Sequence, residues 1–170
     1  MWLIGMYNGL VQQDQEVKTQ WAQIENQLKR RADLIPNLVE TVKGFAAQEK
    51  EIIGQITAAR AALSGAGTPA EAAEADAALT SALGRLLVVV EAYPNLKSDQ
   101  TFIRLMDELS GTENRIAVAR KDYNDVVKVY NVKVRTFPTN VIAPMFGFAL
   151  ADYFEITDAE AQTPQVDFGK

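Results

Sequence analysis

The sequence contains neither cysteine nor histidine among its 170 residues. Without cysteine the chain has no disulfide and no thiolate, so its composition does not indicate a redox compartment. Without histidine it lacks the commonest general base and the commonest metal ligand. Di-iron bundles built on Glu-x-x-His pairs and zinc hydrolase motifs are therefore excluded.

Basic residues are outnumbered, because 17 Lys and Arg stand against 22 Asp and Glu, for a net charge of −5. Nucleic-acid binding needs a basic surface, so no nucleic acid is expected as a partner. Gly65-Ala66-Gly67 has neither the lysine of a phosphate-binding loop nor the dinucleotide-binding spacing. From the residues present we expect no cofactor, no metal and no enzymatic activity.

The sequence does have strong helical periodicity. Large apolar or aromatic residues recur every seven positions at Phe102, Leu109, Ile116, Tyr123, Tyr130 and Phe137. This spacing places them on one face of a long helix that packs against other helices. Three more periodic stretches predict an all-α, antiparallel up-and-down bundle of four long helices over residues 1–137. The expected helices span about 3–33, 36–64, 69–92 and 98–136.

The expected boundaries follow from local signals. Asp33 is a candidate cap for the second helix, with Pro36 tolerated in its first turn. Gly65 and Gly67 indicate its end, and Thr68-Pro69-Ala70-Glu71 is typical of a capping box that begins the third helix. Pro138 stops the fourth helix.

Charged residues fall on several positions where the periodic pattern calls for apolar side chains. Burying an unpaired charge costs several kcal/mol, so such residues must find partners. We therefore predict a buried polar layer that fixes the register of the helices, as polar core residues do in coiled coils. Its members are Asp14, Glu49, Glu113 and Arg120, and Arg31 also falls on the pattern. Binding of a small ligand by this layer is the alternative that remains open.

The tripeptide Pro-Asn-Leu occurs twice, at residues 36–38 and 94–96. In an up-and-down bundle both would lie in connections at the end opposite the N-terminus, which predicts a tip that binds a partner protein. The predicted tip residues are Arg30, Arg31, Asp33, Asn37, Tyr93, Asn95 and Lys97. The alternative is plain turn chemistry, in which Pro fixes φ and Asn bonds the local backbone.

The start of the chain and residues 141–151, near its end, are apolar. Trp2 and Tyr7 flank an apolar start that resembles the water-facing end of a membrane helix. We therefore expect a single-pass membrane helix immediately upstream. Asp14 and Glu16 precede the first lysine, which favours the extracytoplasmic side of the cell membrane for the bundle.

Residues 138–170 form a C-terminal extension and tail with an apolar stretch at 141–151, which Pro144 and Gly147 keep from becoming a long helix. Because the fourth helix returns to the start of the first, this extension is expected to pack over the N-terminal end of the bundle. In that arrangement Phe146, Phe148, Tyr153 and Phe154 pack on the first turns of the chain or on the last turns of the fourth helix. Contact with the lipid interface is the alternative.

Several longer motifs identify a family resemblance. These are residues 7–11 (YNGLV), 30–39 (RRADLIPNLV), 92–97 (AYPNLK), 112–120 (TENRIAVAR), 123–124 (YN), 146–148 (FGF) and 153–154 (YF). In this order, over nearly the whole chain, they closely resemble the LemA family of bacterial proteins. The resemblance implies an N-terminal transmembrane helix followed by a four-helix bundle, without established enzymatic activity or agreed catalytic residues.

Two classes of function follow from this sequence. The first is a membrane-anchored interaction or scaffold module that contacts an unknown protein partner through its distal tip. The second is a sensory bundle that binds a small ligand between its helices and transmits a change in packing. Self-association into a homo-oligomer is compatible with both.

Overall fold

In the computed structural model, which describes residues 2–155, every regular element is a helix. The order is α1 (Trp2–Ala46), α2 (Lys50–Gly65), α3 (Pro69–Val90), α4 (Pro94–Lys97), α5 (Gln100–Arg135) and α6 (Thr139–Met145). Within the described residues there is no strand, so the predicted all-helical class is confirmed.

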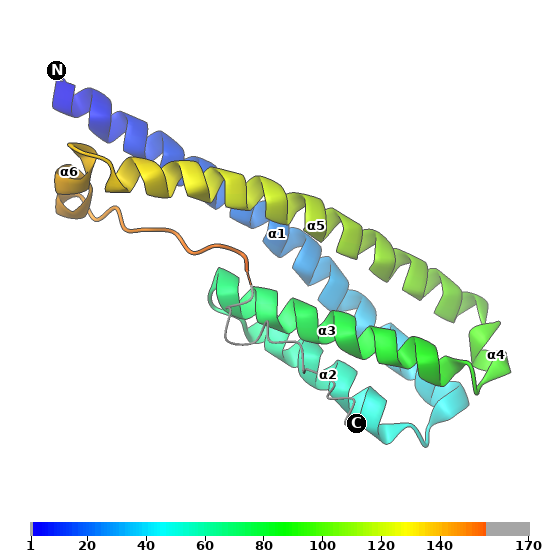
Figure 1. The fold of residues 1–170 in the computed structure, drawn as a ribbon. Helices are drawn as coiled ribbons and strands as arrows, with labels where there is room; N and C mark the ends of the chain where they lie inside the picture. Colours follow the sequence, from blue (N-terminus) through cyan, green and yellow to red (C-terminus); the bar gives the residue numbers. More distant parts are fainter. Residues whose placement is uncertain (1, 156–170) are drawn as a thin grey trace, which may run out of the picture.

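The two long helices α1 and α5 run antiparallel along the length of the molecule (Figure 1). Helices α2 and α3 form a shorter antiparallel hairpin that lies beside only the half of this pair furthest from the N-terminus (Figure 1). The expectation of four long helices is therefore wrong, because α2 and α3 have 16 and 22 residues against 45 and 36 in α1 and α5.

The predicted boundary between the first two helices is also wrong. Helix α1 continues through Pro36 to Ala46, and the chain turns at Ala47, Gln48 and Glu49 instead. A proline inside a helix leaves the carbonyl four residues earlier without its amide donor. Here that carbonyl belongs to Ala32, and Arg60 of α2 donates to it from Nε at 3.0 Å. Because the missing bond is replaced from outside, the helix does not need to end.

Other predicted boundaries agree with the structure. The Thr68 hydroxyl accepts a bond from the Glu71 amide at the start of α3, and the Asp99 carboxylate accepts one from the Phe102 amide at the start of α5. The core runs along the α1–α5 seam and into the α2–α3 hairpin, and its fully buried members include Leu10, Ile24, Leu38, Ile56, Leu79, Leu86, Leu109 and Val127. In the described part of the chain no helix combines the length and the apolarity needed to cross a membrane.

Candidate functional site

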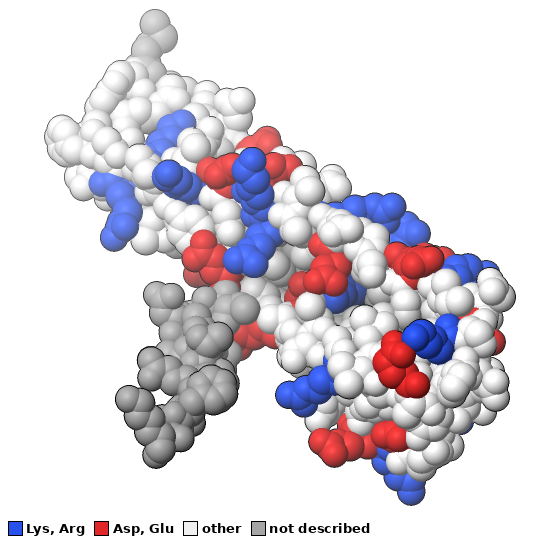
Figure 2. All heavy atoms as spheres, turned by 45° about the vertical axis from the view of Figure 1, so that its right-hand side comes forward, with Lys and Arg blue, Asp and Glu red and all other residues white. Residues whose placement is uncertain are grey.

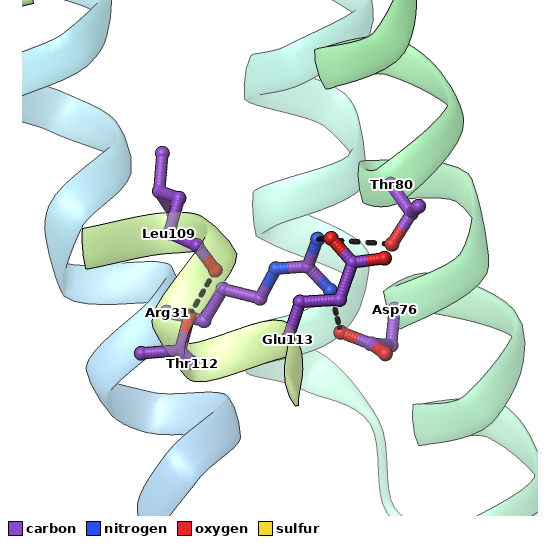
Figure 3. A network of polar contacts seen from close by, with 6 residues as sticks. All are labelled: Arg31, Asp76, Thr80, Leu109, Thr112 and Glu113. Atoms are coloured by element: carbon purple, nitrogen blue, oxygen red, sulfur yellow. Dashed lines mark hydrogen bonds and ion pairs between the residues drawn. The ribbon is translucent and has the colours of Figure 1, made fainter. Parts of the chain in front are cut away.

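A buried arginine crosses the centre of the wide half of the molecule, the half in which α1, α2, α3 and α5 lie alongside one another (Figure 1). Arg31 of α1 has no solvent exposure, and its guanidinium reaches helices α3 and α5 (Figure 3). Its Nη1 lies 2.5 Å from the Asp76 carboxylate, and its Nη2 donates to the Thr80 hydroxyl at 2.9 Å. The same Nη2 lies 3.6 Å from the Glu113 carboxylate of α5. Arg31 thus joins three helices through one side chain.

The electrostatics of this cluster combine burial with pairing. Burial raises the pKa of the Asp76 carboxyl above its usual range, while the Arg31 guanidinium opposes that shift. The Nε of Arg31 is buried and has no hydrogen-bond partner among the residues that the structure describes. Breaking the Arg31–Asp76 pair, which ties α1 to α3, would leave a buried guanidinium without its carboxylate partner and would be strongly destabilising.

The predicted buried layer of Asp14, Glu49, Glu113 and Arg120 does not form. Asp14 is half-buried and pairs with Lys18 of its own helix at 2.6 Å. Glu49 lies in the α1–α2 turn, where its carboxylate accepts a bond from the Tyr93 hydroxyl. Glu113 and Arg120 are exposed, although Glu113 does contact Arg31.

The error has a physical cause in the register of α5. In the second half of α5, Val127 and Val134 follow Tyr123 and Tyr130 by four residues, and all four are buried. In the first half the buried companions Leu105 and Thr112 follow Phe102 and Leu109 by three residues. The buried companion thus moves by one residue, from three to four positions after its partner, and the contact face shifts around the helix. Extending the later register backwards therefore selected Glu113 and Arg120, one residue beyond the buried face.

Sequence reasoning missed Asp76 and Thr80, the main partners of Arg31. The two residues are four apart and lie on one face of α3, as their common contact with Arg31 shows (Figure 3). A groove of about 380 Å³ lies beside the cluster between α3 and α5, and Asp76, Thr80, Glu113, Arg120 and Phe154 line part of it. It is a hollow in the surface of the molecule, next to the exposed side chains of Glu113 and Arg120.

After α6 the chain returns along α5 as an extended segment, residues 148–154, which we call the strap (Figure 1). Two Tyr-Asn pairs in α5 hold its backbone. The Tyr130 hydroxyl donates to the Ala149 carbonyl at 2.8 Å, and the Tyr123 hydroxyl donates to the Asp152 carbonyl at 2.7 Å. The side-chain amide of Asn131 bonds both the N–H and the carbonyl of Ala151, and the amide of Asn124 does the same at Phe154.

The repeat of these contacts follows from simple geometry. The two Tyr-Asn pairs are seven residues apart in α5, and their partners are three residues apart in the strap. Seven residues of helix rise about 10.5 Å and three residues of extended chain span about 10 Å, so the two repeats match. The sequence signal for the strap was the repeat of Tyr-Asn at 123–124 and 130–131. The core pattern alone did not distinguish these tyrosines from ordinary core residues.

The strap places aromatic rings at both of its ends. Phe154 is buried beside Trp21, well along α1, with ring centroids 6.1 Å apart and ring planes inclined at 48°. At the other end, the Tyr7 ring lies 5.1 Å from Phe146 and 5.9 Å from Phe148. The extension therefore contacts the first turns of α1 through Phe146 and Phe148, whereas Phe154 lies against the middle of the α1–α5 pair. The rest of the predicted extension, residues 156–170, lies outside the described residues.

The predicted tip is divided by the continuation of α1. Arg30, Arg31, Asp33 and Asn37 lie within α1, and Arg31 is 15 residues, or about 22 Å, before its end. The actual end of the molecule consists of the α1–α2 turn and the α4 region, which we call the far end. There the Tyr93 hydroxyl bonds Glu49 and Gln48, and Asn95 and Lys97 are exposed.

Residues 20–168 match the model of the LemA family. Magnetosome protein MamQ 2 and Magnetosome protein MamQ 1 of Paramagnetospirillum magneticum are each 30% identical to the chain, over 96% of it and 71% of the relative. Protein LemA of Metamycoplasma hominis is 25% identical, over 96% of the chain and 76% of the relative.

Proposed function

Because the chain belongs to the LemA family, we propose that it is a membrane-associated helical protein that acts as an interaction or scaffold module rather than as an enzyme. The observation that carries this proposal is the polarity of the molecule from end to end. One end is free of charge, because residues 1–13 and 136–151 contain no Asp, Glu, Lys or Arg. The far end, by contrast, carries charged and amide side chains.

The far end is the surface that we assign to partner binding. The α1–α2 and α3–α5 connections meet there, held together by the Tyr93 hydroxyl between Gln48 and Glu49. Lys97 bridges to Glu91 at 2.7 Å, and Asn95 is exposed beside it. In this proposal the wide half of the molecule, where α1, α2, α3 and α5 lie alongside one another, serves as a four-helix unit that presents this surface.

The buried cluster supports a structural role for the interior. Both terminal nitrogens of Arg31 are engaged by side chains of α3 and α5, which makes the cluster a cross-link of the helices. A rigid wide half suits a scaffold, since the far end then keeps a fixed geometry relative to the uncharged end. The alternative of a small-ligand sensor remains a prediction.

Site-specific photo-crosslinking in the native membrane tests the proposal. A photoreactive residue is placed at Asn95 or at Lys97 of the full-length protein, and a matched control carries it at Lys121, which is exposed in the middle of α5. We expect the same discrete protein adduct from the two far-end positions and none from Lys121. Equal adducts from all three positions, or none from the far end, would contradict the proposal. Cell fractionation of the same protein separately tests its association with the membrane.

A further inference from the structure

We propose that α6 and the residues flanking it form a lipid-contacting surface that rests in the headgroup region of an anionic bilayer, beside the first turn of α1. This inference rests on the membrane association proposed above. It adds the surface that makes the contact, the class of lipid and the mode of contact, which is peripheral and parallel to the membrane plane.

The outward side of this segment is apolar and open to solvent. Phe137 is 79% exposed and Met145 77%, and Val141, Phe146 and Leu150 are each at least half exposed. On the inward side, Ala143 is fully buried and Phe148 packs against the core. Exposed apolar side chains gathered in this way mark an interaction surface.

The start of α1 belongs to the same surface. Tyr7 touches the rings of Phe146 and Phe148, so α6 is fixed beside the first turns of α1. One turn earlier Trp2, Leu3 and Ile4 are all more than half exposed. We call this combined surface, residues 2–4 and 137–150, the apolar end.

The charged residue nearest to α6 in the chain is basic, since Arg135 lies four residues before Thr139 whereas Asp152, in the strap, lies seven residues after Met145. Arg135 and Lys133 lie in the last turn of α5, directly before the segment that leads to α6. Lys133 donates to the Gly9 carbonyl at 2.8 Å, and the first acid of α1, Asp14, lies five residues further along the helix. On the face shown in Figure 2, this end of the molecule is largely uncharged, and Lys and Arg are met before Asp and Glu on moving away from it. An apolar surface with a basic border fits an anionic lipid surface.

The shape of α6 decides between lying on a bilayer and crossing it. The helix has seven residues, which span about 10 Å, whereas a bilayer core needs about 20 helical residues. Gly147, at a φ of +78°, then reverses the chain, and the Phe148 and Gly147 amides bond the Ala143 and Pro144 carbonyls. This Schellman ending turns the chain back into the strap. The segment is therefore too short to cross a bilayer, and its contact with lipid is confined to the headgroup interface.

Vesicle flotation of the 170-residue chain tests the inference. The vesicles contain either a zwitterionic phospholipid alone or a mixture with an anionic phospholipid. We expect binding to the anionic vesicles, weakened at high salt, and at least about ten-fold weaker binding for the triple variant Phe137→Ser, Met145→Ser, Phe146→Ser. Arg135→Gln should weaken binding roughly five-fold, as expected for one basic residue near the membrane surface.

A matched control removes exposed apolar side chains elsewhere. Leu87, Val88 and Val118 are each at least half exposed in the wide half, and their triple change to Ser should leave flotation unaltered. Helical circular dichroism of all variants verifies the fold. A polarity-sensitive fluorophore at position 145 should shift to the blue on anionic vesicles.

Each other outcome overturns the inference in a distinguishable way. If the triple variant at Phe137, Met145 and Phe146 floats as the parent does, the membrane contact lies elsewhere and membrane association survives without this surface. The apolar end is not a lipid surface if the chain binds no vesicle. The same holds if the only effect of the triple variant is to convert a dimer, seen by sedimentation, into monomers. Fractionation of the full-length protein then decides the proposed membrane association independently.

Discussion

The Nε of Arg60 donates a 3.0 Å hydrogen bond to the carbonyl of Ala32, the group that Pro36 leaves without its helical donor. A guanidinium from α2 thus repairs a defect inside α1, twenty-eight residues away in the sequence. An interior proline costs a helix about 3 kcal/mol, partly through this missing bond. The contact explains why α1 passes through a residue that normally ends a helix.

This relationship makes the effect of Arg60 depend on Pro36. Arg60→Met should destabilise the protein by about 1–3 kcal/mol, since it removes a charged donor from a carbonyl that has no other helical donor. In the Pro36→Ala background the restored amide bonds Ala32, so the same change should cost clearly less. Urea unfolding of the four proteins gives the coupling energy. Additive effects would show that Arg60 does not replace the missing bond.

The buried cluster predicts a large effect at Arg31 and a small one at Arg120. Arg31→Met leaves Asp76 without its cation in a buried site and should destabilise the fold by roughly 3–5 kcal/mol. Arg120→Met is the matched control, because Arg120 is exposed, and should stay within about 0.5 kcal/mol of the parent. Denaturant unfolding measures both. Equal, small effects would mean that the Arg31–Asp76 pair does not hold the helices.

Pattern reading was enough to predict the helical class from periodicity, and the starts of α3 and α5 from local signals to within two residues. It failed at the turn after α1, because Ala47-Gln48-Glu49 contains neither Gly nor Pro, while Pro36 gives a stop signal that Arg60 cancels. The cancelling contact joins residues far apart in sequence, and local rules cannot foresee it. Glu49 on the core pattern was the available hint, since a charge at a core position can mark a break.

The candidate site was harder to predict for a related reason. Arg31 falls on the core pattern, yet its partners Asp76 and Thr80 lie on a helix whose own pattern gives no sign of a cation opposite. The positions of Glu113 and Arg120 depended on a change of one residue in the register of α5 between Ile116 and Tyr123. A seven-residue repeat describes each half of α5 but does not report the shift between them.

The strap should depend on the two asparagines of α5. Asn131→Asp replaces the amide that donates to the Ala151 carbonyl with a charged acceptor, and Asn124→Asp does the same at Phe154. Each change loses a bond and adds a repulsion, so the strap should open more often. Faster hydrogen exchange of the Ala151 and Phe154 amides measures this opening.

The control for the strap is Asn114→Asp, at an exposed position of the same helix. It adds the same charge without touching the strap and should leave the exchange rates as they are. If Asn131→Asp and Asn124→Asp also leave them unchanged, the Tyr123 and Tyr130 hydroxyls or the buried Phe154 ring hold the strap instead.

Tyr123 should make stability sensitive to alkaline pH. Burial, with a smaller contribution from the Asp152 carboxylate, raises the pKa of its hydroxyl from 10.0 to about 12. Between these values the unfolded chain loses the proton while the folded protein keeps it. Stability that is complete below pH 10 is therefore lost as the pH rises through about 12. The strap should loosen over the same range, because the ionised oxygen no longer donates to the Asp152 carbonyl.

Two measurements check this expectation on the parent and on Tyr123→Phe. The near-ultraviolet absorbance of tyrosinate should show a late component in the parent that is smaller by one tyrosine in the variant, where Tyr130, whose pKa burial also raises, still contributes. Urea unfolding at rising alkaline pH should show a shallower loss of stability in the variant, because one fewer group binds its proton more tightly in the folded state. Tyr7→Phe, which removes the hydroxyl of a partly exposed tyrosine beside the opposite end of the strap, is the control and should keep the late component. A late component of equal size in Tyr123→Phe and in the parent would show that burial against the strap does not hold the proton of the Tyr123 hydroxyl.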